Sequence, residues 1–143
     1  MFLFHYSNIA MHNQLNCVLL IDDNDDDNFY HELVLRETDI TKQIHVSETA
    51  LKALKFLETT STVPELIFLD INMPRVNGWE FLDRYRELDT EKKAAVVIIM
   101  LTTSINPVDK KRADAIPEVN GFESKPLTHE MVTNIIKKFF PNH

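Results

Sequence analysis

Short apolar runs recur along this chain, and between them apolar residues repeat about every 3.6 positions. Three runs are strongly apolar, at 17–21, 66–69 and 95–101, and a weaker one lies at 119–122. A fifth, 43–46, alternates polar and apolar residues. Uninterrupted runs are typical of parallel strands covered by helices on both faces, whereas alternation suits a sheet edge. The pattern predicts five strands in one parallel sheet.

The stretches between the runs have the spacing of amphipathic helices. In the first, 25–37, we expect Phe29, Leu33 and Val34 to face the sheet. In the second, 48–58, Leu51, Leu54 and Leu57 mark the same kind of face, with Ala50 and Ala53 beside them. The other helices are expected at 78–88, at 127–140 and, behind an Asn106 cap, from Pro107 to Pro117. A βα unit repeated five times with right-handed crossovers gives an α/β fold, a doubly wound parallel sheet.

Size and composition limit the possible functions. A length of 143 residues suits one domain, and the net charge of −7 disfavours generic binding to nucleic acid or anionic membranes. Only two glycines are present, which excludes a glycine-rich phosphate loop. Cys17 is the only cysteine, so no internal disulfide can form and a reducing, cytoplasmic location is expected.

Residues 1–13 precede the first strand and do not match the repeating pattern. Their aromatic start is too short to span a membrane and lacks the basic flank of a signal peptide. We expect 1–13 to be a disordered extension and 14–143 to be the folded domain. Membrane anchoring by the aromatic residues is the alternative.

Chemically active side chains follow the ends of the predicted strands. Asp22 and Asp23 follow the first strand, Asp70 ends the third, Thr102 follows the fourth and Lys125 follows the fifth. The carboxyl ends of parallel strands meet at one edge of a sheet, so these residues are expected to converge. Three carboxylates, a hydroxyl and an ammonium suit metal-assisted phosphoryl transfer.

Five signatures in this order resemble the receiver domain of two-component response regulators, in its stand-alone, chemotaxis-type form. They are Asp22-Asp23, Asp70-Ile71-Asn72-Met73-Pro74 with Asn77-Gly78, Leu101-Thr102-Thr103, Phe122, and Lys125-Pro126. The resemblance covers about residues 16–140. It implies a flavodoxin-like (βα)5 sheet with strand order 2-1-3-4-5.

The resemblance also implies how the site works. Asp70 would accept a phosphoryl group from a partner histidine kinase or histidine phosphotransfer protein. Mg²⁺, or Mn²⁺, would be held by Asp23, Asp70 and the backbone carbonyl of Asn72, with Asp22 acting through a metal-bound water. Lys125 would pair with Asp70 before phosphorylation and with a phosphoryl oxygen after it.

Further residues would carry the signal or shape the site. By resemblance, Thr102 and Phe122 form the switch, although plain core packing stays open for Phe122. Pro74, Gly78 and Pro126 would be structural, with a cis peptide bond between Lys125 and Pro126. A downstream protein would dock on the face made by the fourth helix, fifth strand and fifth helix, and the chain would be a monomer or weak homodimer.

Several residues have simpler interpretations. The run 25–27 suits a helix N-terminus, with direct metal contact as the alternative. The six histidines show no metal spacing and are interpreted as surface or incidental residues. By resemblance, Asn72 and Ser104 would flank the path of the hydrolytic water. Both are small and polar, so we expect the phosphoryl group to be lost in seconds to minutes.

Two rival functions remain. A haloacid-dehalogenase-type phosphohydrolase also uses an aspartyl nucleophile, but it needs a second aspartate at the position that Asn72 occupies. A phosphate-independent pseudo-receiver is the other. The expected role is therefore a signalling protein that takes part in its own phosphorylation and is not an enzyme in the usual sense. The missing output domain disfavours direct control of transcription.

Overall fold

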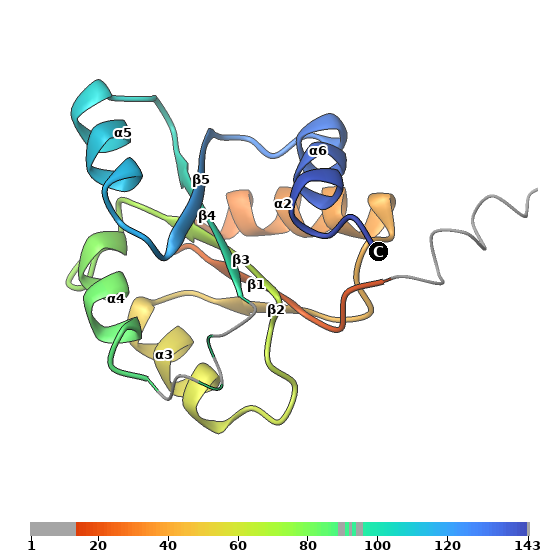
Figure 1. Ribbon diagram of the computed structural model, residues 1–143, viewed down its shortest axis with the longest axis horizontal. Helices are drawn as coiled ribbons and strands as arrows, with labels where there is room; N and C mark the ends of the chain where they lie inside the picture. Colours follow the sequence, from red (N-terminus) through yellow and green to blue (C-terminus); the bar gives the residue numbers. More distant parts are fainter. Residues whose placement is uncertain (1–13, 89–90, 92, 94–95, 143) are drawn as a thin grey trace, which may run out of the picture.

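Five parallel strands form one sheet in the computed structural model, which describes residues 14–88, 91, 93 and 96–142 (Figure 1). The strands are β1 (Val18–Ile21), β2 (Ile44–Ser47), β3 (Leu66–Asp70), β4 (Val97–Thr102) and β5 (Val119–Ser124). Their order is β2-β1-β3-β4-β5, which confirms the predicted flavodoxin-like topology. The predicted extension 1–13 and Ala95 lie outside the described residues.

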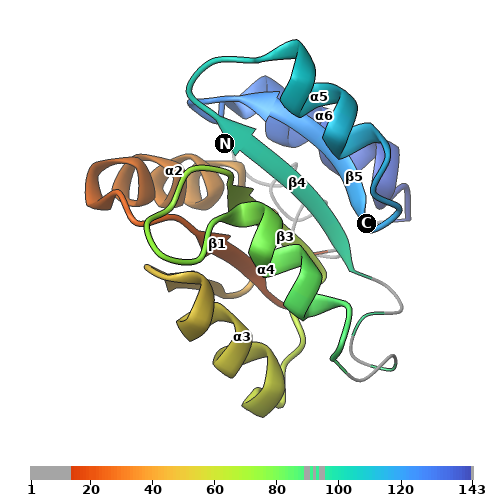
Figure 2. The ribbon, with the colours of Figure 1, turned by 90° about the vertical axis from the view of Figure 1, so that its left-hand side faces the viewer.

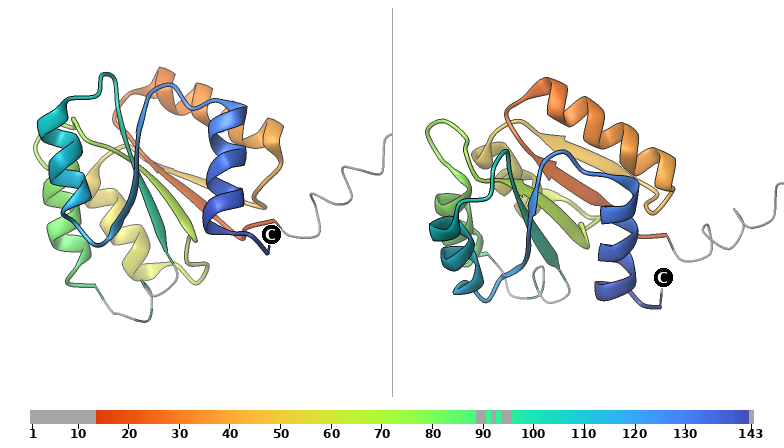
Figure 3. Two further views of the ribbon diagram at one scale, coloured as in Figure 1. Left: turned by 45° about the horizontal axis from the view of Figure 1, so that its top comes forward. Right: turned by 90° about the horizontal axis from the view of Figure 1, so that it is seen from above.

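Helices cover both faces of the sheet (Figures 2 and 3). They are α2 (Asp25–Thr38), α3 (Ala50–Thr59), α4 (Gly78–Tyr85), α5 (Pro107–Asp114) and α6 (His129–Phe139). Alternate residues of the strands point to opposite faces. Leu20 and Phe68 therefore pack with α2 and α6, while Leu19 and Ile67 pack with α3 and α4. No helix among the described residues is long and apolar enough to cross a membrane.

Each helix begins at a side-chain cap. A cap residue accepts a hydrogen bond from the backbone N–H two or three positions later, and so pairs a group that the helix leaves free. The caps are Asn24, Thr49, Asn77, Asn106 and Thr128. The predicted Asn106 cap with proline at the first helical turn is thus confirmed.

The predicted buried face of α2 is wrong in two of its three residues. Phe29 and Leu33 are 74% and 42% exposed, whereas Val34 is buried as expected. The buried Asn28 donates from Nδ2 to the backbone carbonyl of Asp22 at 2.9 Å. Asn28 shares the buried face of the helix with His31, Val34 and Leu35, and Phe29, one residue or about 100° further round, is exposed.

Two smaller predictions also fail. In α3, Leu51 is 51% exposed, whereas the other residues predicted for its buried face, Ala50, Ala53, Leu54 and Leu57, are buried as expected. His31 was interpreted as a surface or incidental residue, but it is 2% exposed. Burial lowers its pKa and so favours the neutral form of the imidazole.

Gly78 begins α4 where the helix passes close to the end of β3. A Cβ atom here would lie 2.8 Å from the Asp70 carbonyl oxygen and 3.0 Å from the Ile71 Cα. Gly78→Ala is therefore expected to lower the free energy of unfolding by about 2 kcal/mol, because backbone atoms cannot easily move aside. Urea denaturation would measure the loss.

Gly121→Ala is the matched control. Its Cβ would lie 2.7 Å from Cδ1 of Ile99, the end of a side chain that can rotate away. We expect a smaller loss for this variant. A loss at Gly78 no greater than that at Gly121 would contradict the close-approach argument.

Candidate functional site

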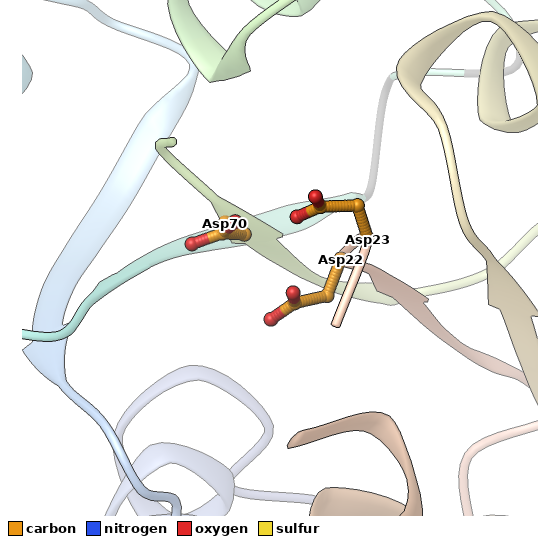
Figure 4. Close-up of side chains that lie close together, drawn as sticks. All are labelled: Asp22, Asp23 and Asp70. Atoms are coloured by element: carbon orange, nitrogen blue, oxygen red, sulfur yellow. The ribbon is translucent and has the colours of Figure 1, made fainter. Parts of the chain in front are cut away.

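Three carboxylates meet at the carboxyl edge of the sheet (Figure 4). Asp22 and Asp23 directly follow β1, and Asp70 is the last residue of β3. One oxygen of each lies within 4.8 Å of one oxygen of the other two. Asp22 and Asp70 are 3% and 4% exposed, whereas Asp23 is open to solvent. The cluster therefore has two largely buried carboxylates and one that is open to solvent.

Lys125 lies in the middle of the buried part of this site. Its Nζ is 2.7 Å from Asp22 Oδ2, 2.9 Å from Asp27 Oδ2 and 3.1 Å from Asp70 Oδ1. The Lys125 side chain is 8% exposed. Its backbone N–H donates to the Thr102 carbonyl at 2.7 Å, and its peptide bond to Pro126 is cis, as the resemblance implies.

The charged groups of the site shift one another's pKa values. Burial raises the pKa of Asp70 to about 6, the Asp22 carboxylate adds to the rise, and Lys125 opposes it. For Lys125, burial acts to lower the pKa, but hydrogen bonds to Asp22 and Asp27 outweigh it and the pKa is raised. At neutral pH Asp70 is mostly ionised and Lys125 is charged.

Local hydrogen bonds hold the site residues in place. The Asn24 N–H donates to Asp22 Oδ1 at 3.0 Å, which turns this carboxylate toward the start of α2. On the other side, the Ile71 N–H donates to the Leu101 carbonyl, and the Gly78 N–H donates to the Ile71 carbonyl. Asp70 thus ends a strand whose following turn is bonded to both β4 and α4.

The predicted switch residues flank the acidic cluster. Thr102, at the end of β4, is 3% exposed, and its hydroxyl donates to the Ser104 carbonyl at 3.0 Å. Phe122 is 9% exposed and packs in the core between the sheet and α3–α5. Core packing thus describes Phe122 in this structure, and its part in a switch stays a prediction.

The loop after β3 carries the remaining predicted residues. Asn72 and Pro74 are exposed in it, and Gly78 closes it against the Asp70 carbonyl. Arg75 adopts a φ of 68°, so the loop turns sharply there. The predicted metal contact of the Asn72 carbonyl and the structural role of Pro74 stay predictions.

Two residues of the site were missed from the sequence. Asp27 was interpreted as part of a helix N-terminus, yet its carboxylate also pairs with Lys125. His31 lies one turn further along α2, near enough for the charges of Asp27, Lys125 and Asp22 to act on its pKa. The available signal was the spacing of four residues from Asp27 to His31, which places both on one side of the helix.

The acidic cluster suits a hard divalent cation. Asp22, Asp23 and Asp70 offer only oxygen ligands, which Mg²⁺ and Mn²⁺ prefer, and solvent can supply the remaining positions at Asp23. Three clustered carboxylates with a single lysine also leave excess negative charge. The donor set therefore fits the ion that the resemblance implies.

Comparison with known proteins decides the family. Residues 18–137 match the response regulator receiver domain. The chain belongs to this family. A two-component response regulator from Cytophaga hutchinsonii has a solved structure that is 32% identical, with a TM-score of 0.82, covering 90% of this chain and 98% of that one.

Other relatives of this receiver belong to signalling proteins. Response regulator Rcp1 from Synechocystis is 32% identical over 64% of this chain and 65% of its own. The probable methanogenesis regulatory protein FilR2 from Methanothrix harundinacea is 27% identical over 85% of this chain and 79% of its own. The sensor histidine kinase CheAY from Helicobacter pylori is 26% identical, but this chain spans 14% of its length.

Asp70→Asn is expected to stabilise the metal-free protein. A folded-state pKa of about 6, above the ordinary 3.8, means that ionising Asp70 disfavours the fold as pH rises from about 4 to 6. At pH 7.5 with chelator, removing this charge should raise the free energy of unfolding by about 1–3 kcal/mol. Chemical denaturation measures the gain, which should shrink near pH 4.

Asp23→Asn is the control, because Asp23 is exposed in the same cluster. We expect it to change the stability of the metal-free protein less than Asp70→Asn does. Equal effects of both variants, or a loss for Asp70→Asn, would contradict the burial argument.

His31 is expected to make the fold sensitive to mild acid. Its folded-state pKa is lowered, so the unfolded chain binds more protons once pH falls below about 6.5, and stability is lost there. The free energy of unfolding of the wild type should fall more between pH 7.5 and 5.5 than that of His31→Gln. Equal pH slopes would show that the imidazole protonates as easily in the fold as in the unfolded chain.

Proposed function

We propose that this receiver accepts a phosphoryl group on Asp70 from the phosphohistidine of a histidine kinase or histidine phosphotransfer protein. The observation that carries the proposal is the Lys125 ammonium, 3.1 Å from Asp70 Oδ1 beside a three-carboxylate cluster. A carboxylate can act as nucleophile toward phosphorus once the charge around it is neutralised. Asp70 is ionised at neutral pH and lies next to that neutralising charge.

The transfer is a substitution at phosphorus. A carboxylate oxygen of Asp70 forms the new P–O bond, the P–N bond of the donor breaks, and the freed imidazole takes a proton from solvent. Asp70 then no longer carries its own carboxylate charge, and Lys125 turns from it to a phosphoryl oxygen. As a compact ammonium on a flexible chain, Lys125 can contact the site both before and after transfer.

Asp22, Asp23 and Asp70 would hold a divalent cation, with the Asn72 carbonyl as a further ligand. When bound, Mg²⁺ or Mn²⁺ neutralises charge on the transferring phosphoryl group. The chain's own part is to keep these oxygens at one sheet edge with two of the carboxylates buried.

Output would follow from a change in the loop after β4. The Thr102 hydroxyl now donates to the Ser104 carbonyl. Turning it toward a phosphoryl oxygen would break that bond and free the segment that leads into α5. Ile105 and Val108, which are 53% and 74% exposed, lie on this segment, so the proposed docking face of α5, β5 and α6 would change its apolar surface.

Acetyl phosphate with Mg²⁺ tests the proposal, with intact mass as the measurement. We expect one added phosphoryl group in the wild type, lost over seconds to minutes after the donor is removed. Asp70→Asn and a chelated sample should show none. An unmodified wild type that is folded and has bound Mg²⁺ would favour a pseudo-receiver that signals without phosphate.

A further inference from the structure

Asp27 joins the site from a separate element. It lies in the first turn of α2, whereas its partner Lys125 follows β5, 98 residues later in the chain. The Lys125 Nζ donates to Asp27 Oδ2 at 2.9 Å. The Asp27 side chain is 34% exposed, so this contact lies at the rim of the buried site.

The lysine ammonium has three N–H donors and no acceptor. Asp22, Asp27 and Asp70 are its carboxylate partners among the described residues, with one oxygen of each between 2.7 and 3.1 Å from Nζ. Asp22 and Asp70 also belong to the acidic cluster at the sheet edge, whereas Asp27 does not. Asp27 is thus the one partner of Lys125 that neither accepts phosphate nor lies among the candidate metal ligands.

We propose that Asp27 is a positioning residue that holds the Lys125 ammonium in place during phosphoryl transfer. The inference rests on the proposed function. Asp70 loses its ion pair with Lys125 when it becomes the acyl phosphate, and Asp22 is also a candidate metal ligand. Asp27 lies outside the acidic cluster and keeps its hydrogen bond to Nζ, and therefore holds the ammonium aimed at the incoming phosphoryl oxygen.

Simple charge repulsion predicts the opposite effect. Asp27 adds a negative charge near a site that must accept an anionic donor, so removing that charge would by itself speed phosphorylation. If Asp27 instead anchors Lys125, its removal loosens the ammonium and slows the reaction. The sign of the change in rate distinguishes the two.

The test compares Asp27→Ala with Asp26→Ala, using acetyl phosphate and Mg²⁺. Asp26 lies in the same helical turn and is exposed, and it is not one of the carboxylates that pair with Lys125 in the part of the chain that the structure describes. We expect Asp27→Ala to slow phosphorylation about tenfold, as misplaced catalytic groups do. Asp26→Ala should change the rate less than about twofold.

Asp27→Asn is the rescue variant, because its amide oxygen still accepts a hydrogen bond without the charge. We expect its rate to lie between those of the wild type and Asp27→Ala. If Asp27→Ala fails to fold, the phosphorylation rates of Asp27→Asn and Asp26→Asn are compared instead. A rate for the Asp27 variants equal to or above that of the matched Asp26 variant would overturn the proposal.

A second readout needs no phosphorylation. In metal-free protein, the ¹⁵N-bound ammonium protons of Lys125 should exchange slowly enough for NMR detection, because the side chain is 8% exposed and its Nζ lies against three carboxylates. We expect that signal to persist in Asp26→Ala and to broaden or vanish in Asp27→Ala. An unchanged Lys125 signal in Asp27→Ala would overturn the proposal that Asp27 anchors the ammonium. A wild type that is not phosphorylated, but shows the expected NMR difference, would overturn only the proposed function.

Discussion

The site depends on one buried ammonium ion. Lys125 is surrounded by carboxylates from β3, from the turn after β1 and from the first turn of α2. Any two of these carboxylates would repel each other in a place with little water, and an unpaired lysine there would lose its charge. The ion pairs therefore make a cluster of buried acids possible.

The fold serves this arrangement by bringing strand ends together. β1, β3 and β4 are adjacent in the sheet, so Asp22, Asp70 and Thr102 lie at the ends of neighbouring strands. Lys125 directly follows β5, which pairs with β4 at the edge of the sheet. The turns that follow are fixed by backbone hydrogen bonds and by the close passage of Gly78. The same segments that build the core thus fix the relative positions of the charged groups.

The strands and the convergence of the charged residues could be predicted, because apolar runs and strand-end residues are local features of a sequence. The sheet order was predicted only from the resemblance to receiver domains. The rotation of α2 could not be predicted, since its buried face includes the polar residues Asn28 and His31 beside Val34 and Leu35. The pattern of apolar residues predicted that Phe29 is buried, but polar residues occupy part of the buried face and Phe29 is exposed. Asp27 and His31 were missed for the same reason, because their roles depend on how that helix is turned.

The central claim is that Asp70, among several neighbouring aspartates, receives the phosphoryl group. Borohydride reduction of the phosphorylated protein, followed by tandem mass spectrometry, would locate it, because an acyl phosphate is reduced to an alcohol at the modified residue. We predict reduction at Asp70 alone. Reduction at Asp22, Asp23 or Asp27 in place of Asp70 would contradict the account.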